Sequence, residues 1–306
     1  MRELTVAARS RLASKDERHS HRRDPDGRLE FVELADRRLL ASRRWPGEGV
    51  PLVALHGLFD CSLGWKHVAA ATPRPCVAFD LPGFGRSAMP AENRFASYAH
   101  DILCALDILG VGSFSLVGHS LGGAVAAQLS EQAGERALNL TSLAPAGFGP
   151  VPLAELLEDS AAGRLVRRAV PLALSNPLSA AGIYMAVVAH GRPPERQLLG
   201  RVIRRAFSAA PGAVAANEAI VASARDPRGF VHRPVRYGGP VSVLWGASDI
   251  LIPVSHAAQV REALPQAKVT VWEGMGHHPQ RERPEQLNDY LAATTRTQSR
   301  ALSLAA

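Results

Sequence analysis

Short apolar runs alternate with helical patterns along this chain, and that alternation constrains its fold more than any other feature. The runs are PLVALH, CVAFDL, FSLVGH and NLTSLAP, all within residues 51–145. They are nearly continuous in apolar residues, which is typical of strands buried on both faces of a parallel sheet. Helical patterns follow the second and third runs, in SYAHDILCALDILGV and LGGAVAAQLSEQAG. This order predicts an α/β fold in which crossover helices cover both faces of the sheet.

The alternation stops at about Gly147 and resumes at about Tyr237. Before the gap, LEFVELADRRLLASRRW predicts an opening hairpin. After it, PVSVLWG and KVTVWEG predict two strands separated by a helix around HAAQVREALP, with a final helix near PEQLNDYLAAT. The residues between are rich in Ala, Leu, Arg and Pro and favour short helices. We predict a core of residues 28–147 and 237–296, with residues 148–236 inserted as a helical cap over the carboxyl ends of the strands.

Residues 1–27 are dense in charges of both signs and have no apolar period, so we interpret them as a mobile, solvated segment. They also lack the unbroken apolar stretch of a secretory signal. The three cysteines, Cys61, Cys76 and Cys104, are odd in number and form no C-x-x-C pair. We therefore expect no disulfide framework, no metal site and a cytoplasmic location.

The formal net charge of +7 raises the possibility of a nucleic-acid partner. Most of the excess lies between residues 150 and 236, however, and only 6% of residues are aromatic, so a base-stacking platform is not expected. The uncharged stretch 169–189 has the length of a membrane span, but Pro171, Asn176 and Pro177 interrupt it. We predict no membrane span and no nucleic-acid partner, and interpret the stretch as a cap element that lines an apolar pocket for a small molecule. The sequence carries no signal for an oligomeric state.

The stretch LVGHSLGG places Ser120 at the spacing G-x-S-x-G, at the junction of a predicted buried strand and a predicted helix. This is the context of a nucleophile elbow, in which a strained turn raises the serine above the sheet and the flanking glycines permit close backbone approach. The helix that begins there points its free N–H groups at the reacting centre. Leu121, directly after the serine, is the candidate donor of one oxyanion N–H.

A serine is a weak nucleophile without a base, so this interpretation requires a histidine and an orienting carboxylate. Asp249 stands three residues after the predicted strand VSVLWG, and His277 stands in the loop after KVTVW. The chain order Ser, Asp, His is the one expected for elbow chemistry. We predict a catalytic triad of Ser120, Asp249 and His277.

Five motifs in order resemble the α/β-hydrolase superfamily, and specifically its cap-containing esterases and C–C bond hydrolases. They are His56-Gly57 after a strand, DLPGFGRS at 80–87, GHSLG at 118–122, WGASD at 245–249, and the run GMGHHPQRERP at 274–284. The resemblance covers about residues 30 to 293. It implies an α/β-hydrolase fold with a mostly parallel sheet and an inserted helical cap, no cofactor, and a second oxyanion N–H from Leu58.

The resemblance also implies roles for residues near the predicted triad. The family's run G-x-G-H-x-P-x-x-E-x-P identifies His277 as the base and leaves His278 at a variable position, pocket-side or solvated, with a contact to substrate still open. Asp80 is expected to be a structural turn residue, and His56 a hydrogen-bonded structural residue. Because the nucleophile is serine rather than aspartate, haloalkane dehalogenase and epoxide hydrolase chemistry are not expected.

The expected activity is hydrolysis of a carboxylic ester of a small apolar substrate through an acyl-enzyme. A second hypothesis is C–C bond hydrolysis of a vinylogous diketone, because SLAPAGFGP at 142–150 is similar to a stretch of those enzymes, although HGLFDCSLGW lacks their S-G-P-G run. A third is a binding protein on the hydrolase fold that does not turn its ligand over. Multiple turnover of an ester separates the third hypothesis from the first.

Overall fold

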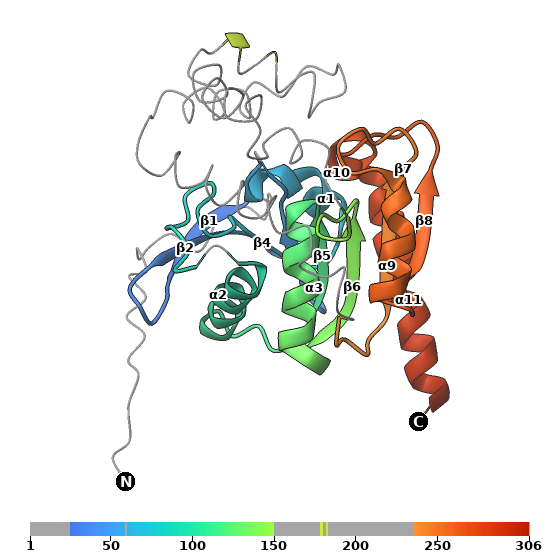
Figure 1. Cartoon of the computed structure of the whole chain (residues 1–306). Helices are drawn as coiled ribbons and strands as arrows, with labels where there is room; N and C mark the ends of the chain where they lie inside the picture. The colour runs from blue at the N-terminus through green and yellow to red at the C-terminus, as the bar shows by residue number, and fades with distance from the viewer. Residues whose placement is uncertain are drawn as a thin grey trace.

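An eight-stranded sheet runs through the part of the chain that this computed structural model describes, which is residues 25–58, 60–92, 94–149, 178, 179, 182 and 235–305 (Figure 1). The spatial order of the strands is β1-β2-β4-β3-β5-β6-β7-β8. Their bounds are β1 Arg28–Glu33, β2 Leu39–Trp45, β3 Leu52–Leu55, β4 Cys76–Phe79, β5 Phe114–His119, β6 Ala137–Leu143, β7 Val241–Gly246 and β8 Lys268–Trp272. Strands β1, β2 and β4 pair antiparallel, and every other neighbouring pair is parallel.

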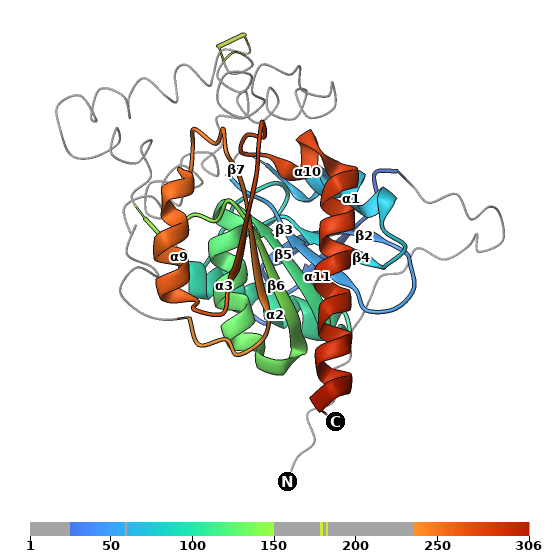
Figure 2. The same cartoon turned by 90° about the vertical axis from the view of Figure 1, so that its right-hand side faces the viewer.

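Helices cover both faces of the sheet (Figure 2). On one face lie α2 Phe95–Ile108, α3 Leu121–Ala133 and α9 Ala257–Ala263; on the other lie α1 Lys66–Ala71, α10 Pro279–Glu282 and α11 Pro284–Ala305. Short 3₁₀ turns occur at Ser62–Trp65, Gly134–Arg136 and Val254–His256. The predicted α/β-hydrolase fold class is therefore confirmed, including the mostly parallel sheet and its opening hairpin. Among the described residues, no helix has the length and hydropathy needed to cross a bilayer.

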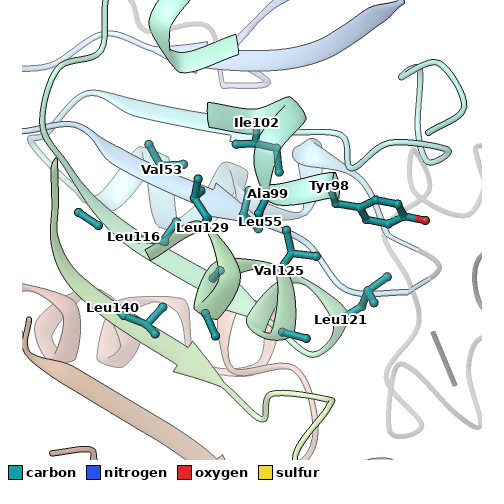
Figure 3. Packing of buried hydrophobic residues seen from close by; sticks show 14 of the residues in the cluster. Val53, Leu55, Tyr98, Ala99, Ile102, Leu116, Leu121, Val125, Leu129 and Leu140 are labelled. Carbon is teal, nitrogen blue, oxygen red and sulfur yellow. The ribbon is translucent and has the colours of Figure 1, made fainter. Parts of the chain in front are cut away.

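Alternate residues of the central strand β5 explain why the sheet is buried on both sides. Leu116 belongs to the cluster shared with α2 and α3, while its neighbour Val117 belongs to the cluster shared with α1 and α11. In the first cluster, Val53, Leu55, Leu116 and Leu140 from the strands pack against Ile102, Val125 and Leu129 from the helices (Figure 3). Each large aliphatic side chain buried in this way contributes about 1.5–3 kcal/mol.

Parallel pairing brings the carboxyl ends of β3, β5, β6, β7 and β8 to one edge of the sheet. In the register, Leu55 of β3 is opposite Gly118 of β5, and Leu143 of β6 is opposite both His119 and Leu244 of β7. Segments far apart in the sequence therefore meet where these strands end, which is the usual ligand-binding edge of an open α/β sheet.

Some predicted segments fall outside the described residues. These are nearly all of the predicted cap, 148–236, with the uncharged stretch 169–189 inside it, and residues 1–24 of the predicted mobile segment 1–27. The sequence pattern did not indicate α1 or α10, because six and four residues are too few to show a helical period. It also predicted the last helix too short, since α11 continues to Ala305.

Candidate active site

Ser120 adopts a backbone conformation that L-residues rarely occupy, with φ 53° and ψ −118°. Such a conformation costs of order 1–3 kcal/mol and persists only where the surroundings fix it. Its N–H donates to the Leu143 carbonyl at 2.9 Å, and its own carbonyl accepts from the N–H groups of Gly123 at 2.9 Å and Ala146 at 3.0 Å. The strand β6 and the first turn of α3 therefore hold the strained turn in place.

The two motif glycines are explained by close backbone approach. A Cβ placed on Gly118 would lie 2.2 Å from the Gly122 carbonyl oxygen, and one on Gly122 would lie 2.4 Å from the Leu55 carbonyl oxygen. Neither position has room for a side chain, because each contact is with backbone that cannot move alone. The spacing G-x-S-x-G is thus a packing requirement of the strand-to-helix turn between β5 and α3.

His277 and Asp249 form a buried pair. The His277 Nδ1–H donates to Asp249 Oδ2 at 2.7 Å, and the side chains are 4% and 0% exposed. Asp249 Oδ1 accepts two backbone N–H groups, from Leu251 and Ile252, both at 2.9 Å. With both oxygens bonded, the carboxylate is fixed in orientation and fixes in turn which nitrogen of His277 carries the proton. The Nε2 of His277 is left to accept a proton.

The loops that carry this pair are tied to each other. The Trp245 indole N–H donates to the Ile252 carbonyl at 3.0 Å, which closes the loop after β7 around Asp249. The Ser248 N–H donates to the Met275 carbonyl at 2.9 Å, which joins that loop to the segment before His277. The register between β7 and β8 therefore decides that Asp249 reaches the imidazole.

Glu282 brackets the histidine. One of its carboxylate oxygens accepts the N–H of Gly276, and the other accepts the N–H of His278, both at 2.9 Å. The side chain on α10 thus holds the backbone on both sides of His277. Glu282 occupies the glutamate position of the family's motif, but its role could not be predicted, because a carboxylate that acts through backbone N–H groups is not distinguishable by spacing alone.

The segment His56-Gly57-Leu58 lies against the serine. A Cβ on Gly57 would lie 3.0 Å from Ser120 Cβ, so glycine permits this approach. The ring of His56 is fully buried; its Nδ1–H donates to the Gly57 carbonyl at 2.7 Å, and its Nε2 accepts the Leu81 N–H at 3.0 Å. Because N–H and C=O point in opposite directions across a trans peptide, fixing the Gly57 carbonyl also fixes the N–H of Leu58. The second oxyanion candidate, Leu121, is the first residue of α3, and its N–H has no acceptor within the helix.

His119, which precedes the serine, connects the elbow to the histidine loop. Its Nε2–H donates to the His277 carbonyl at 2.7 Å, and the two ring centroids are 4.7 Å apart. Burial, followed by the proximity of His277, holds the pKa of His119 well below its ordinary value, so this ring is neutral. No hydrogen bond joins Ser120 Oγ to His277 within the described residues; such bonds often tighten only when substrate is present.

Asp80 and His278, two further residues from the motifs, are both buried. Asp80 accepts the N–H groups of Ser62 at 2.7 Å and Arg86 at 2.8 Å, which fits the structural turn expected of it. His278 is buried rather than solvated, with its ring 4.6 Å from that of His119 and 5.0 Å from that of His277. His119 was not predicted as a site residue, because it occupies a variable position of the G-x-S-x-G motif.

Comparison with known proteins shows the family of this chain. Residues 50–284 match the family model described as the alpha/beta hydrolase fold. The chain belongs to the α/β-hydrolase fold family. This α/β hydrolase is similar to the dihydrolipoyllysine-residue acetyltransferase component of the acetoin cleaving system of Pseudomonas putida, with 31% identity over 265 residues. The aligned residues cover 85% of this chain and 67% of that protein.

Two further proteins are similar to this chain. The 1-acylglycerol-3-phosphate O-acyltransferase ABHD5 of Rattus norvegicus is 30% identical over 273 residues, which cover 78% of this α/β hydrolase and 75% of the relative. A solved structure, Est816, an N-acyl homoserine lactone degrading enzyme, superposes with a TM-score of 0.68 at 25% identity, covering 86% of this chain and 99% of that one. The names of all three proteins refer to an acyl group.

Proposed function

We propose that this α/β hydrolase cleaves the carboxylic ester of a small apolar substrate by two acyl-transfer steps. The observation that carries the proposal is the buried Asp249–His277 pair, with a free Nε2, in the loop bonded to the residue before the strained Ser120. A serine activated by such a base attacks carbonyl carbon, and the names of the acyl-transferring and lactone-degrading relatives are consistent with acyl chemistry.

In the first step, Ser120 Oγ bonds to the ester carbonyl carbon while its proton passes to Nε2 of His277. Asp249 stabilises the imidazolium that results. The N–H groups of Leu58 and Leu121 donate to the oxyanion, each contributing about 3 kcal/mol of transition-state stabilisation. The carbon–oxygen bond to the alcohol then breaks, and His277 returns the proton to the departing alkoxide, leaving an acyl-enzyme and a free alcohol.

In the second step, water attacks the acyl-enzyme while His277 removes one of its protons. The collapse of that oxyanion expels Ser120 Oγ, which recovers its proton from His277, and the acid leaves. Every proton is accounted for by one imidazole, so the cycle draws on no cofactor. Water as the acyl acceptor makes the enzyme a hydrolase.

The test is steady-state hydrolysis of p-nitrophenyl esters from C2 to C12, with the parent chain and Ser120→Ala. We expect repeated turnover by the parent and none by the variant, with the preferred chain length reporting the size of the acyl site. Release of no more than one equivalent of nitrophenol by the parent would overturn the esterase assignment. C–C bond cleavage of a vinylogous diketone and binding without turnover would then be the hypotheses to test.

A further inference from the structure

Three buried histidines meet beside Ser120: His119, His277 and His278. One ring nitrogen from each lies within 4.8 Å of the other two, and the ring centroids are 4.6 to 5.0 Å apart. The exposed fraction of each residue is 1–3%. Imidazole nitrogen is a ligand that Zn²⁺, Cu²⁺ and Ni²⁺ prefer, while Mg²⁺ and Ca²⁺ prefer oxygen. The composition of the cluster therefore selects for a transition-metal ion.

The bonding of His277 matches that of a metal-binding histidine. Such a histidine almost always donates its other ring N–H to a carboxylate or a backbone carbonyl, which orients the ring and increases its basicity. His277 donates Nδ1–H to the buried Asp249 at 2.7 Å. This leaves the Nε2 lone pair for an ion and places a negative charge directly behind the ring.

His119 meets the same requirement with a carbonyl in place of a carboxylate. It donates Nε2–H to the His277 carbonyl at 2.7 Å, so its lone pair is on Nδ1. That nitrogen is buried and has no hydrogen-bond partner among the described residues. Gly57 packs against this nitrogen, and a side chain at that position would cover it, since a Cβ there would lie 2.9 Å from Nδ1. A buried acceptor without a partner is costly, and an ion bound there would satisfy it.

We propose that His119, His277 and His278 together bind one divalent transition-metal ion such as Zn²⁺, and that the ion reversibly inhibits the enzyme. Zn–N bonds of about 2.0–2.1 Å put ligand nitrogens roughly 3.4 Å apart, so small ring rotations close the site. Inhibition follows because the ion occupies Nε2 of His277, the nitrogen that must take the serine proton. The inhibition rests on the proposed esterase function; the binding of metal does not.

The binding half is tested on the Ser120→Ala chain, which is independent of turnover. After metal is stripped with a chelator, calorimetric titration with ZnCl₂ is expected to show one ion per chain, and MgCl₂ no binding. His278→Ala should weaken Zn²⁺ binding by at least about tenfold. The matched control is His100→Ala, because His100 is exposed on α2 with Nε2 3.6 Å from Cys104 Sγ, and it should leave the affinity unchanged.

The outcomes separate the two proposals. The metal site is wrong if the chain binds no Zn²⁺, or if tight binding survives His278→Ala. If that variant unfolds, His278→Gln takes its place. A Co²⁺-loaded parent that lacks the intense visible bands of a low-coordinate ion would contradict the site as well. Zn²⁺ that binds as expected but does not slow ester turnover overturns the inhibition alone. A parent that binds one Zn²⁺ yet hydrolyses no ester retains the metal site and loses the proposed function.

Discussion

Arg281 Nη2 lies 2.5 Å from Asp60 Oδ1, in an ion pair that joins the loop of the oxyanion candidate Leu58 to α10, the helix that follows His277. The Asp60 side chain is 2% exposed and that of Arg281 18%. The same Asp60 oxygen accepts the Cys61 N–H at 2.8 Å, and the absence of a side chain on Gly64 makes room for the carboxylate. Asp60 is two residues after Leu58, and Arg281 is four after His277, so the pair can fix the distance between the two halves of the site.

Replacing one member of this pair should be more harmful than replacing both. Asp60→Asn removes the buried carboxylate that pairs with the partly exposed Arg281, which we expect to cost up to about 3 kcal/mol of the free energy of unfolding and to lower kcat for ester hydrolysis. The double variant Asp60→Asn/Arg281→Met removes both charges and should recover part of each loss. Urea unfolding and steady-state kinetics measure the two effects. Equal losses in the single and double variants would show that the two residues are not coupled.

The orienting role of Asp249 predicts a loss of kcat without a loss of fold. Asp249→Asn keeps the shape of the side chain but presents an N–H₂ or a neutral oxygen to His277, which disfavours the productive tautomer; kcat should fall by about 10⁴-fold. Thermal unfolding followed by circular dichroism checks the fold. A decrease of kcat of less than tenfold in a folded variant contradicts the triad.

The bracket formed by Glu282 predicts a smaller effect on the same step. Glu282→Gln keeps one acceptor and loses the other, so the backbone around His277 is less firmly held, and we expect kcat to fall by about 10–100-fold with KM little changed. Glu285→Gln, an exposed neighbour at the start of α11, is the matched control and should behave as the parent. Identical kinetics of the two variants would remove Glu282 from the positioning of His277.

The packing of the elbow predicts a strong difference between two glycines. Gly118→Ala places a Cβ 2.2 Å from the Gly122 carbonyl oxygen and should destabilise the chain by about 3 kcal/mol, at the upper end for overpacking. Gly112→Ala places a Cβ in open space at an ordinary φ and should change stability by less than about 1 kcal/mol. Urea midpoints of the two variants test this, and comparable midpoints would be inconsistent with the close approach.

The buried thiol of Cys76 predicts a loss of stability at alkaline pH. Burial raises the pKa of Cys76 from 9.0 to about 12, because the apolar surroundings of this β4 residue disfavour the charged thiolate. Between pH 9 and 12 the unfolded chain loses this proton and the folded chain keeps it, so the free energy of unfolding falls as pH rises, by at most about 1.4 kcal/mol per pH unit.

Cys76→Ala removes this contribution, so its free energy of unfolding should fall less steeply between pH 8 and 11 than that of the parent. Urea unfolding at each pH measures the slope. Cys104→Ala is the comparison: desolvation also raises the pKa of the Cys104 thiol, but this thiol is only partly buried, so the variant should change the slope less than Cys76→Ala does. A slope in Cys76→Ala equal to that of the parent would mean that the thiol ionises in the folded state.

Prediction from sequence worked where the signal is local. The buried strands and the longer helices could be located because each has its own period and composition, as in FSLVGH for β5 and HAAQVREALP for α9. Ser120 was singled out because a glycine-flanked serine at a strand-to-helix junction has few structural explanations. The roles of Ser120, Asp249 and His277 stay predictions until turnover is measured.

Contacts between distant segments could not be predicted in the same way. The Asp60–Arg281 pair and the bond from His119 to the His277 carbonyl join segments that are 158 or more residues apart in the sequence. Nothing in the residue types of those loops indicates that they meet, because each is polar and lies at the end of a different element. Their proximity follows from the parallel order of β3, β5, β7 and β8, which brings the carboxyl ends of these strands together.

The α/β class, the order of the strands along the chain and the candidate triad could be predicted from the amino-acid sequence, since hydrophobic period and motif spacing are local properties of the chain. Three features required the folded structure: which strands are neighbours, the two N–H groups that bond Asp249 while it orients His277, and the cluster of three histidines beside Ser120. The physical reason is that pairing and burial depend on the register of distant strands, and a one-residue change in that register moves every side chain to the other face.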